Sequence, residues 1–132
     1  MKLKQALIGL AVATIATSLF ALPVYAGQWY EKTTKTTYPA IPTFWVRAIA
    51  GGCDEGDYLS DWYADMEHGA TATIPPPPWA WCSYDYEYIL SYSGGKLRKV
   101  TTKAWGNVTF HTGDPPDSFE AVAYVDAGDQ PP

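Results

Sequence analysis

The chain has 132 residues and a formal net charge of −5, with 14 acidic against nine basic side chains. Nucleic acids and anionic membrane surfaces bind basic proteins, so this charge argues against both as partners. Hydrophobic residues make up 47% of the chain and aromatic residues 15%, which supports a packed core and favours strands.

The first 26 residues predict a secretory signal peptide. Two lysines precede an apolar run over residues 6–22, and Val24-Tyr25-Ala26 places small residues at a cleavage site. A membrane anchor is the alternative, but Pro23 and the cleavage site favour removal, and a span needs about twenty unbroken apolar residues. We expect a secreted protein, extracellular or periplasmic, that starts at Gly27 and has no membrane span.

Residues 27–132 suit one domain, with residues 128–132 as a flexible tail. Its first predicted strand, Trp29–Tyr38, is rich in threonine and ends at two prolines, and Thr43–Ala50 is the second. The first strand could also leave its domain and complete the sheet of a second copy, which would give self-association.

A loop over Gly51–Asp57 is expected next, and it contains the first of two cysteines. In an exported chain the pair Cys53 and Cys82 predicts a disulfide, worth roughly 3–4 kcal/mol on the chain-entropy estimate. Zinc is the alternative, but His68 and His111 complete no zinc-motif spacing. The acids Asp54 to Asp57 could hold calcium or be merely solvated, and no EF-hand pattern is present. We predict no metal or cofactor.

Residues 58–74 allow two interpretations. Alternation predicts two strands around a turn at His68-Gly69, with Trp62, Ala64 and Met66 on one face. A short helix over Ser60–Glu67 is the alternative. Pro75–Pro78 predicts a stiff bridge between sheets, with recognition by a proline-binding domain as the alternative.

A long hairpin is predicted over Ser83–Tyr92 and Leu97–Phe110, with Gly94-Gly95 as the turn. A regular register from this turn would gather six side chains on one face, namely Tyr84, Tyr86, Tyr88, Tyr92, Lys103 and Trp105. Such rings can stack on sugars or on a protein surface, with the lysine adding cation–π contacts. The alternative is that this tyrosine face is core, since Leu90 and Leu97 share it.

With a last strand over Phe119–Val125, about seven short strands are expected in one domain. This pattern predicts an all-β fold, an antiparallel two-sheet sandwich of immunoglobulin-like architecture, with a small barrel as the alternative. The Cys–Trp–Cys arrangement of immunoglobulin domains is absent.

No nucleophile or zinc-protease motif is present. Asp61 with Asp65, or Asp85 with Glu87, could form a catalytic carboxylate pair, but any acids two apart on a strand share a face. Asn107 begins a glycosylation sequon, which indicates exposure only weakly. We predict a non-catalytic protein that binds a protein or glycan at a cell surface, or assembles there. A carbohydrate-binding module and a small hydrolase are the alternatives.

Overall fold

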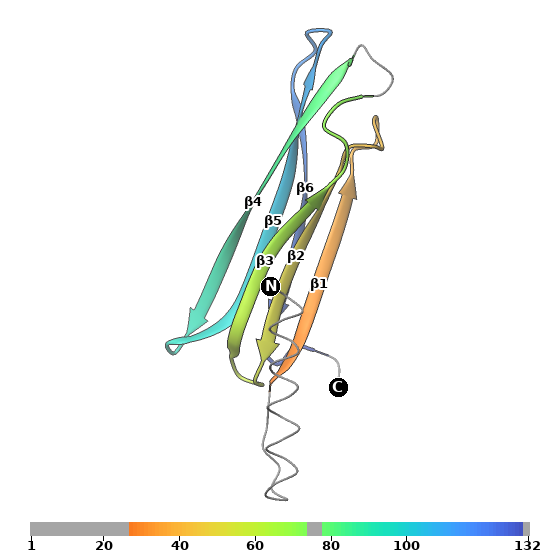
Figure 1. Ribbon diagram of the computed structural model, residues 1–132. Helices are drawn as coiled ribbons and strands as arrows, with labels where there is room; N and C mark the ends of the chain where they lie inside the picture. Colours follow the sequence, from red (N-terminus) through yellow and green to blue (C-terminus); the bar gives the residue numbers. More distant parts are fainter. Residues whose placement is uncertain (1–26, 74–77, 131–132) are drawn as a thin grey trace, which may run out of the picture.

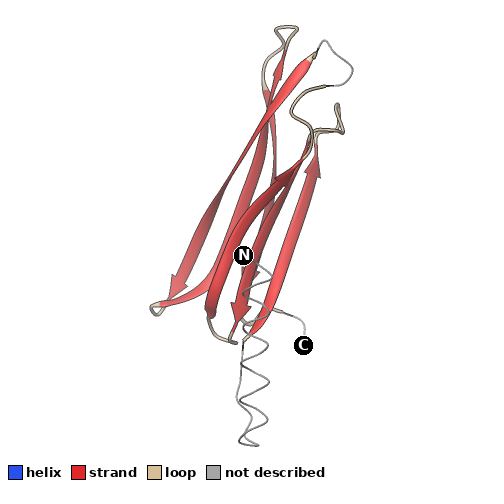
Figure 2. Ribbon diagram, in the orientation of Figure 1, coloured by secondary structure: helices blue, strands red, loops and turns tan. Residues whose placement is uncertain are grey.

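The computed structural model describes residues 27–73 and 78–130. These residues form six strands and no helix, so none of them contributes a helix long enough to cross a membrane. The predicted signal peptide and most of the proline run lie outside the described residues. The strands are β1 Gln28–Thr37, β2 Trp45–Asp54, β3 Leu59–His68, β4 Ala80–Ser93, β5 Lys96–Phe110 and β6 Asp117–Asp126 (Figures 1 and 2).

The strands build two antiparallel sheets of three, in the orders β1-β2-β3 and β4-β5-β6. Side chains from both sheets share one core, as in a small β-sandwich, so the predicted all-β architecture is confirmed at this level. Each sheet is a meander of consecutive strands, without the Greek-key connections of immunoglobulin domains. The sheets do not join through hydrogen bonds among the described strands, so the barrel alternative is wrong.

The strand count is six rather than about seven because β3 does not turn back at His68-Gly69. Residues 59–68 form one strand, which also makes the helix alternative over Ser60–Glu67 wrong. After Gly69 the chain leaves its own sheet and crosses to the other, where Ala72 makes an isolated bridge with Trp81.

Small residues line the middle of the sandwich. Ala48, Ala50 and Gly52 of β2 face Ala104 of β5 and the alanines of β6, all of them buried. Larger side chains pack around this narrow centre, and they come mostly from the edge strands. A second buried cluster at one end of the sandwich contains Tyr38, Phe44, Ala80, Cys82 and Val108.

The predicted loop at Gly51-Gly52 is instead part of β2. An aromatic ring fills the space that a side chain at Gly51 would occupy. Tyr63 pairs with Gly51, and a Cβ on Gly51 would lie 2.0 Å from the Tyr63 ring. The Tyr63 hydroxyl donates to Glu31 on β1, and its ring stacks with Trp29 at 5.8 Å between centroids. A glycine in a strand commonly marks such a close approach.

The predicted disulfide is not formed: Cys53 and Cys82 are both free, buried thiols. Cys53 lies near the end of β2 on the outer side of its sheet, where its thiol is 3.6 Å from a Glu55 carboxylate oxygen. Cys82 lies near the start of β4 and faces the core beside Val108. β2 ends and β4 begins at opposite ends of the sandwich (Figure 1), whereas a disulfide needs Cα atoms within about 7 Å.

Candidate binding surface

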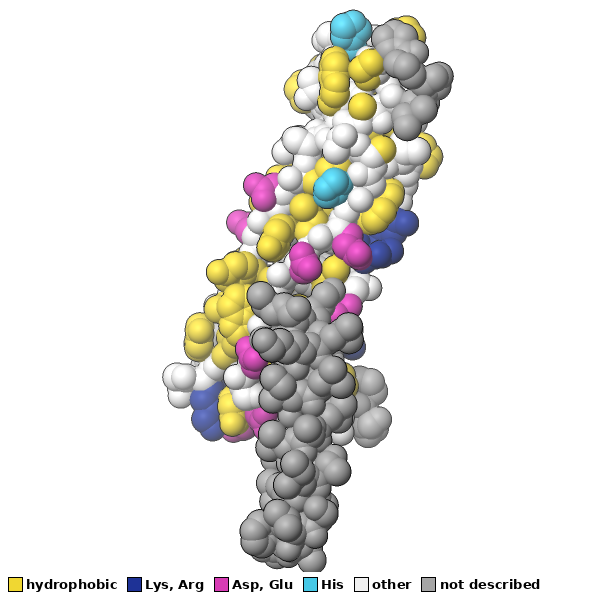
Figure 3. Space-filling model, in the orientation of Figure 1, with side chains coloured by type: hydrophobic (Ala, Val, Ile, Leu, Met, Phe, Trp, Pro, Cys, Tyr) yellow, Lys and Arg dark blue, Asp and Glu magenta, His cyan; other side chains and the backbone are white. Residues whose placement is uncertain are grey.

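The two sides of the sandwich differ. At one side β1 lies against β6, whereas at the other side β4 diverges from β3 along its length (Figure 1). Six inward-facing side chains of β3 and β4 are therefore only partly covered. We call this set the aromatic strip, and it consists of Trp62, Met66, Tyr84, Tyr86, Tyr88 and Leu90. Hydrophobic side chains are gathered over these two strands in Figure 3.

The hairpin that carries the tyrosines is confirmed, but its predicted register is wrong after the first pairs. Tyr92 pairs with Leu97 as expected, and then a β-bulge shifts every later pair by one residue. Tyr86 consequently pairs with Ala104 and Tyr88 with Thr102. A one-residue slip moves side chains to the other face of a strand.

The bulge divides the predicted tyrosine face. Tyr84, Tyr86, Tyr88 and Tyr92 share the side of the sheet that faces β3. Lys103 and Trp105 pair with Glu87 and Asp85, on the opposite side. The structure thus brings the four tyrosines together and does not place Lys103 or Trp105 among them.

One end of the strip is closed by Tyr84. Its ring stacks on His68 with centroids 4.3 Å apart, and its hydroxyl donates to the Ala70 carbonyl at 2.5 Å. Burial raises the pKa of the Tyr84 phenol above its usual value. Tyr84 is therefore a packing residue that joins β4 to the segment after β3.

The middle of the strip is exposed. Tyr88 is 52% exposed and packs on Trp62, with ring centroids 4.8 Å apart, while Tyr86 is 38% exposed. Neither tyrosine belongs to the core clusters, whereas Trp62, Met66, Tyr84 and Leu90 pack against the larger one. Tyr84 thus packs inward, whereas Tyr86 and Tyr88 lie at the surface.

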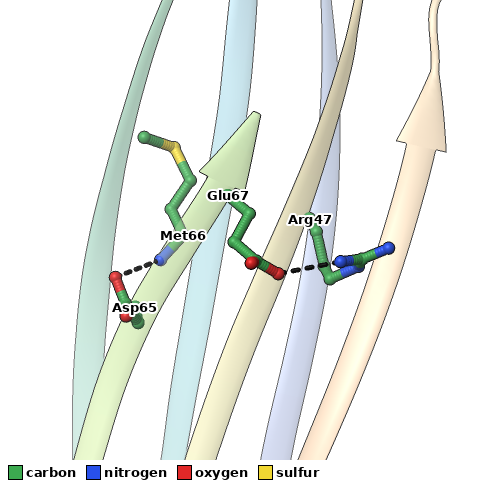
Figure 4. A network of polar contacts seen from close by, with 4 residues as sticks. All are labelled: Arg47, Asp65, Met66 and Glu67. Atoms are coloured by element: carbon green, nitrogen blue, oxygen red, sulfur yellow. Dashed lines mark hydrogen bonds and ion pairs between the residues drawn. The ribbon is translucent and has the colours of Figure 1, made fainter. Parts of the chain in front are cut away.

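Acidic side chains flank the strip on both sides. Asp61, Asp65 and Glu67 lie on the outer side of β3, and Asp85 and Glu87 on the outer side of β4. Glu67 is paired with Arg47 at 2.8 Å, and Met66 points the opposite way (Figure 4). Among the described residues, the other four acids make no ion pair.

Three of these acids bond to backbone at the sheet edges. Asp61, Asp65 and Asp85 each accept a hydrogen bond of 2.8 Å from the N–H of the following residue. The pairs considered for catalysis, Asp61 with Asp65 and Asp85 with Glu87, therefore each contain at least one carboxylate that bonds its own strand.

Trp105 and Lys103 belong to a separate depression on the outer side of the β4-β5-β6 sheet. Its lining includes Glu87, Asn107 and Glu120. Lys103 is 3.2 Å from a Glu120 carboxylate oxygen, and Asn107 is exposed. An aromatic ring among polar groups is the composition that sugar binding uses.

The acids of the 54–57 loop bond to different partners. Asp54 is buried and accepts hydrogen bonds from the Gly56 and Gly128 amides, while Glu55 accepts one from Ser60. Asp57 pairs with Lys96 at 3.0 Å, which lowers the pKa of this carboxyl. These acids do not converge, and no group of metal-binding side chains occurs within the described ranges.

The sequence did not predict that side chains of β3 and β4 together form the aromatic strip. Its alternation placed Trp62 with Met66 on one face of β3, and the tyrosines on one face of β4. No local pattern shows that these faces meet across the open side of the sandwich, because the two strands are joined by a crossover and not by a hairpin.

Comparison with protein-family models, with curated proteins and with solved structures finds no significant match to this chain.

Proposed function

We propose that this protein is exported and acts without catalysis, by attaching to a protein or glycan at a cell surface through the aromatic strip. Adhesion, or assembly of an extracellular structure, is the role that such attachment serves. The proposal rests on the exposure of Tyr86 and Tyr88, which both lie outside the core clusters, and on the packing of Tyr88 against Trp62. Contiguous exposed rings of this kind characterise binding surfaces.

Self-association through β1 is a narrower form of this proposal. β1 has no fully buried residue, and among its side chains Tyr30 packs against the core. It is nevertheless paired along its whole length with β2, and Trp29 and Glu31 contact Tyr63. Exchange of β1 between copies would have to break these contacts.

Carbohydrate binding is the second candidate function, and the depression around Trp105 favours it. There Lys103, Glu120 and Asn107 offer donors and acceptors beside an indole ring. This surface is separate from the strip, so variants distinguish the two candidates.

The experiment uses three labelled proteins: the wild type, a variant of Tyr86 and Tyr88, and a variant of Trp105. It measures how much of each is retained on the cells that produce the protein and on insoluble polysaccharides. Tyr86→Ala combined with Tyr88→Ala should lower retention by about ten-fold or more, because central aromatic residues dominate binding energy. Trp105→Ala is the matched control on the opposite face. Melting temperatures should stay near wild type for the tyrosine variant, because surface substitutions are usually near-neutral.

Retention lost only in Trp105→Ala would transfer the function to the depression. Equal retention of all three proteins would contradict attachment through either surface.

A further inference from the structure

β4 is an edge strand with a free backbone edge. It pairs with β5 on one side, and its even-numbered residues direct their backbone groups to the other side. Two bonds establish this direction: the Cys82 N–H donates to the Thr71 carbonyl, and the Thr73 N–H donates to the Ala80 carbonyl. By the period of two, the N–H and C=O groups of Tyr84, Tyr86, Tyr88 and Leu90 point the same way.

The chain itself shows how this edge accepts a strand. Residues 71–73 lie antiparallel to the start of β4, with the bridge between Ala72 and Trp81. Beyond that bridge, no backbone partner on the free side of residues 84–90 of β4, away from β5, occurs among the described residues. A strand that continued this short addition would lie along the open side of the sandwich. Its inward side chains would contact Tyr86, Tyr88 and Trp62.

The edges at the open side differ in how they are protected. On β3 the outward N–H groups of Trp62 and Met66 each bond to the preceding aspartate. On β4 only the Tyr86 N–H is bonded in this way, to Asp85. Natural sheets protect edges by such means, and an exposed apolar edge is a pairing site. β4 is thus the more open edge.

The charge beside this edge selects the partner. Asp85 and Glu87 lie on the outer side of β4, and Asp61 and Asp65 lie across the strip, all without ion pairs among the described residues. An added strand would take the Tyr86 N–H from Asp85, and this carboxylate would then need a cation. Lysine or arginine on the outward positions of the strand would supply it.

We infer that a partner protein docks by adding an extended strand to β4, antiparallel to residues Tyr84–Leu90, with apolar side chains inward and basic side chains outward. This inference rests on the proposed function and names the partner of the same strip. Main-chain bonds to the edge provide affinity, and the alternating side chains provide specificity.

The test uses a synthetic peptide of about ten residues that alternates valine and lysine, the length of a typical edge strand. The controls are a valine–glutamate peptide and an N-methylated valine–lysine peptide, which cannot donate at alternate amides. Only the first peptide should bind, with amide exchange at Tyr84, Tyr86, Tyr88 and Leu90 slowed by about ten-fold or more. Asp85→Asn with Glu87→Gln should weaken binding, whereas Glu120→Gln, on the same outer side but separated from β4 by β5, should not.

Equal binding of the N-methylated peptide, or no protection of the β4 amides, would overturn strand addition. If strand addition failed in this way but Tyr86→Ala with Tyr88→Ala still abolished cell-surface retention, attachment through the aromatic strip would remain supported without strand addition. A dimer formed without peptide through the β4 edge, seen by sedimentation and by mutual protection of the same amides, would replace the basic partner with a second copy.

Discussion

Thr102 combines complete burial with an unsatisfied hydroxyl. It lies on the inner side of β5, paired with Tyr88 and Ala123, and its Oγ1 has no hydrogen-bond partner among the described residues. Thr102→Val removes a buried polar group at little change in shape, so it should stabilise the fold by about 1 kcal/mol. Urea unfolding measures this, with neighbouring Thr101→Val, on the outer side, as control. A loss of stability in Thr102→Val would show that the hydroxyl is bonded in solution.

Buried phenols make the stability depend on alkaline pH. Burial is the main cause that raises the pKa of Tyr38, Tyr63 and Tyr84, and a nearby carboxylate adds to it for Tyr38 and Tyr63. The folded protein then holds these protons more tightly than the unfolded chain. The resulting stability is complete below the ordinary tyrosine pKa of about 10 and is lost as the pH rises further.

We therefore expect the melting temperature to fall steeply above about pH 10. Tyr63→Phe and Tyr84→Phe should each make that fall shallower, because phenylalanine has no proton to lose. Exposed Tyr92→Phe should leave the profile as it is. Identical profiles for all of these proteins would contradict the burial of the phenols.

In the β4–β5 hairpin, the local sequence predicts the turn but not the register of the two strands. The turn was predictable because Gly-Gly suits two positive φ angles, and Gly94 and Gly95 have φ of 60° and 77°. The bulge was not, since nothing in residues 91–99 distinguishes a bulge from a regular ladder. Its consequence is large, because it alone decides that Trp105 leaves the face of the tyrosines.

The positive φ angles of the turn predict how substitutions at Gly94 and Gly95 change stability. Gly95→Val should destabilise the hairpin by about 1–2 kcal/mol, because a β-branched residue is strained at positive φ. Gly94→Asn should be nearly neutral, since asparagine tolerates this region. Space is no obstacle, as nothing lies within 4 Å of a Cβ at either position. Equal stability of the two variants in urea would exclude the assigned turn.

For the molecule as a whole, the sequence predicted two stacked sheets but not that Cys53 and Cys82 remain free thiols. A pair of cysteines in a chain that is expected to be exported permits a disulfide, whereas its formation depends on where the strands place the two residues. Here the β2–β3 and β4–β5 hairpins hold Cys53 and Cys82 at opposite ends. The openness of the β3–β4 side is equally non-local, because it follows from how the two sheets stack.

The thiols can be counted directly. Burial is the largest cause that raises the pKa of both Cys53 and Cys82, and both side chains are covered. Native protein should therefore react slowly with an alkylating reagent at neutral pH, and unfolded, unreduced protein should take up two equivalents. If the unfolded protein took up no alkylating reagent before reduction, Cys53 and Cys82 would be joined in a disulfide. The two sheets would then have to be arranged differently.

The open side of the sandwich is the feature on which the proposed function depends, and amide hydrogen exchange along β4 tests it most directly. Odd-numbered residues such as Asp85, Glu87 and Ile89 bond to β5 and should exchange slowly. The Tyr88 and Leu90 amides point to the free edge and should exchange far faster, with Tyr86 between the two because Asp85 accepts its N–H. Uniformly slow exchange from residue 84 to residue 90 would mean that the edge is covered, and it would contradict an open side between β3 and β4.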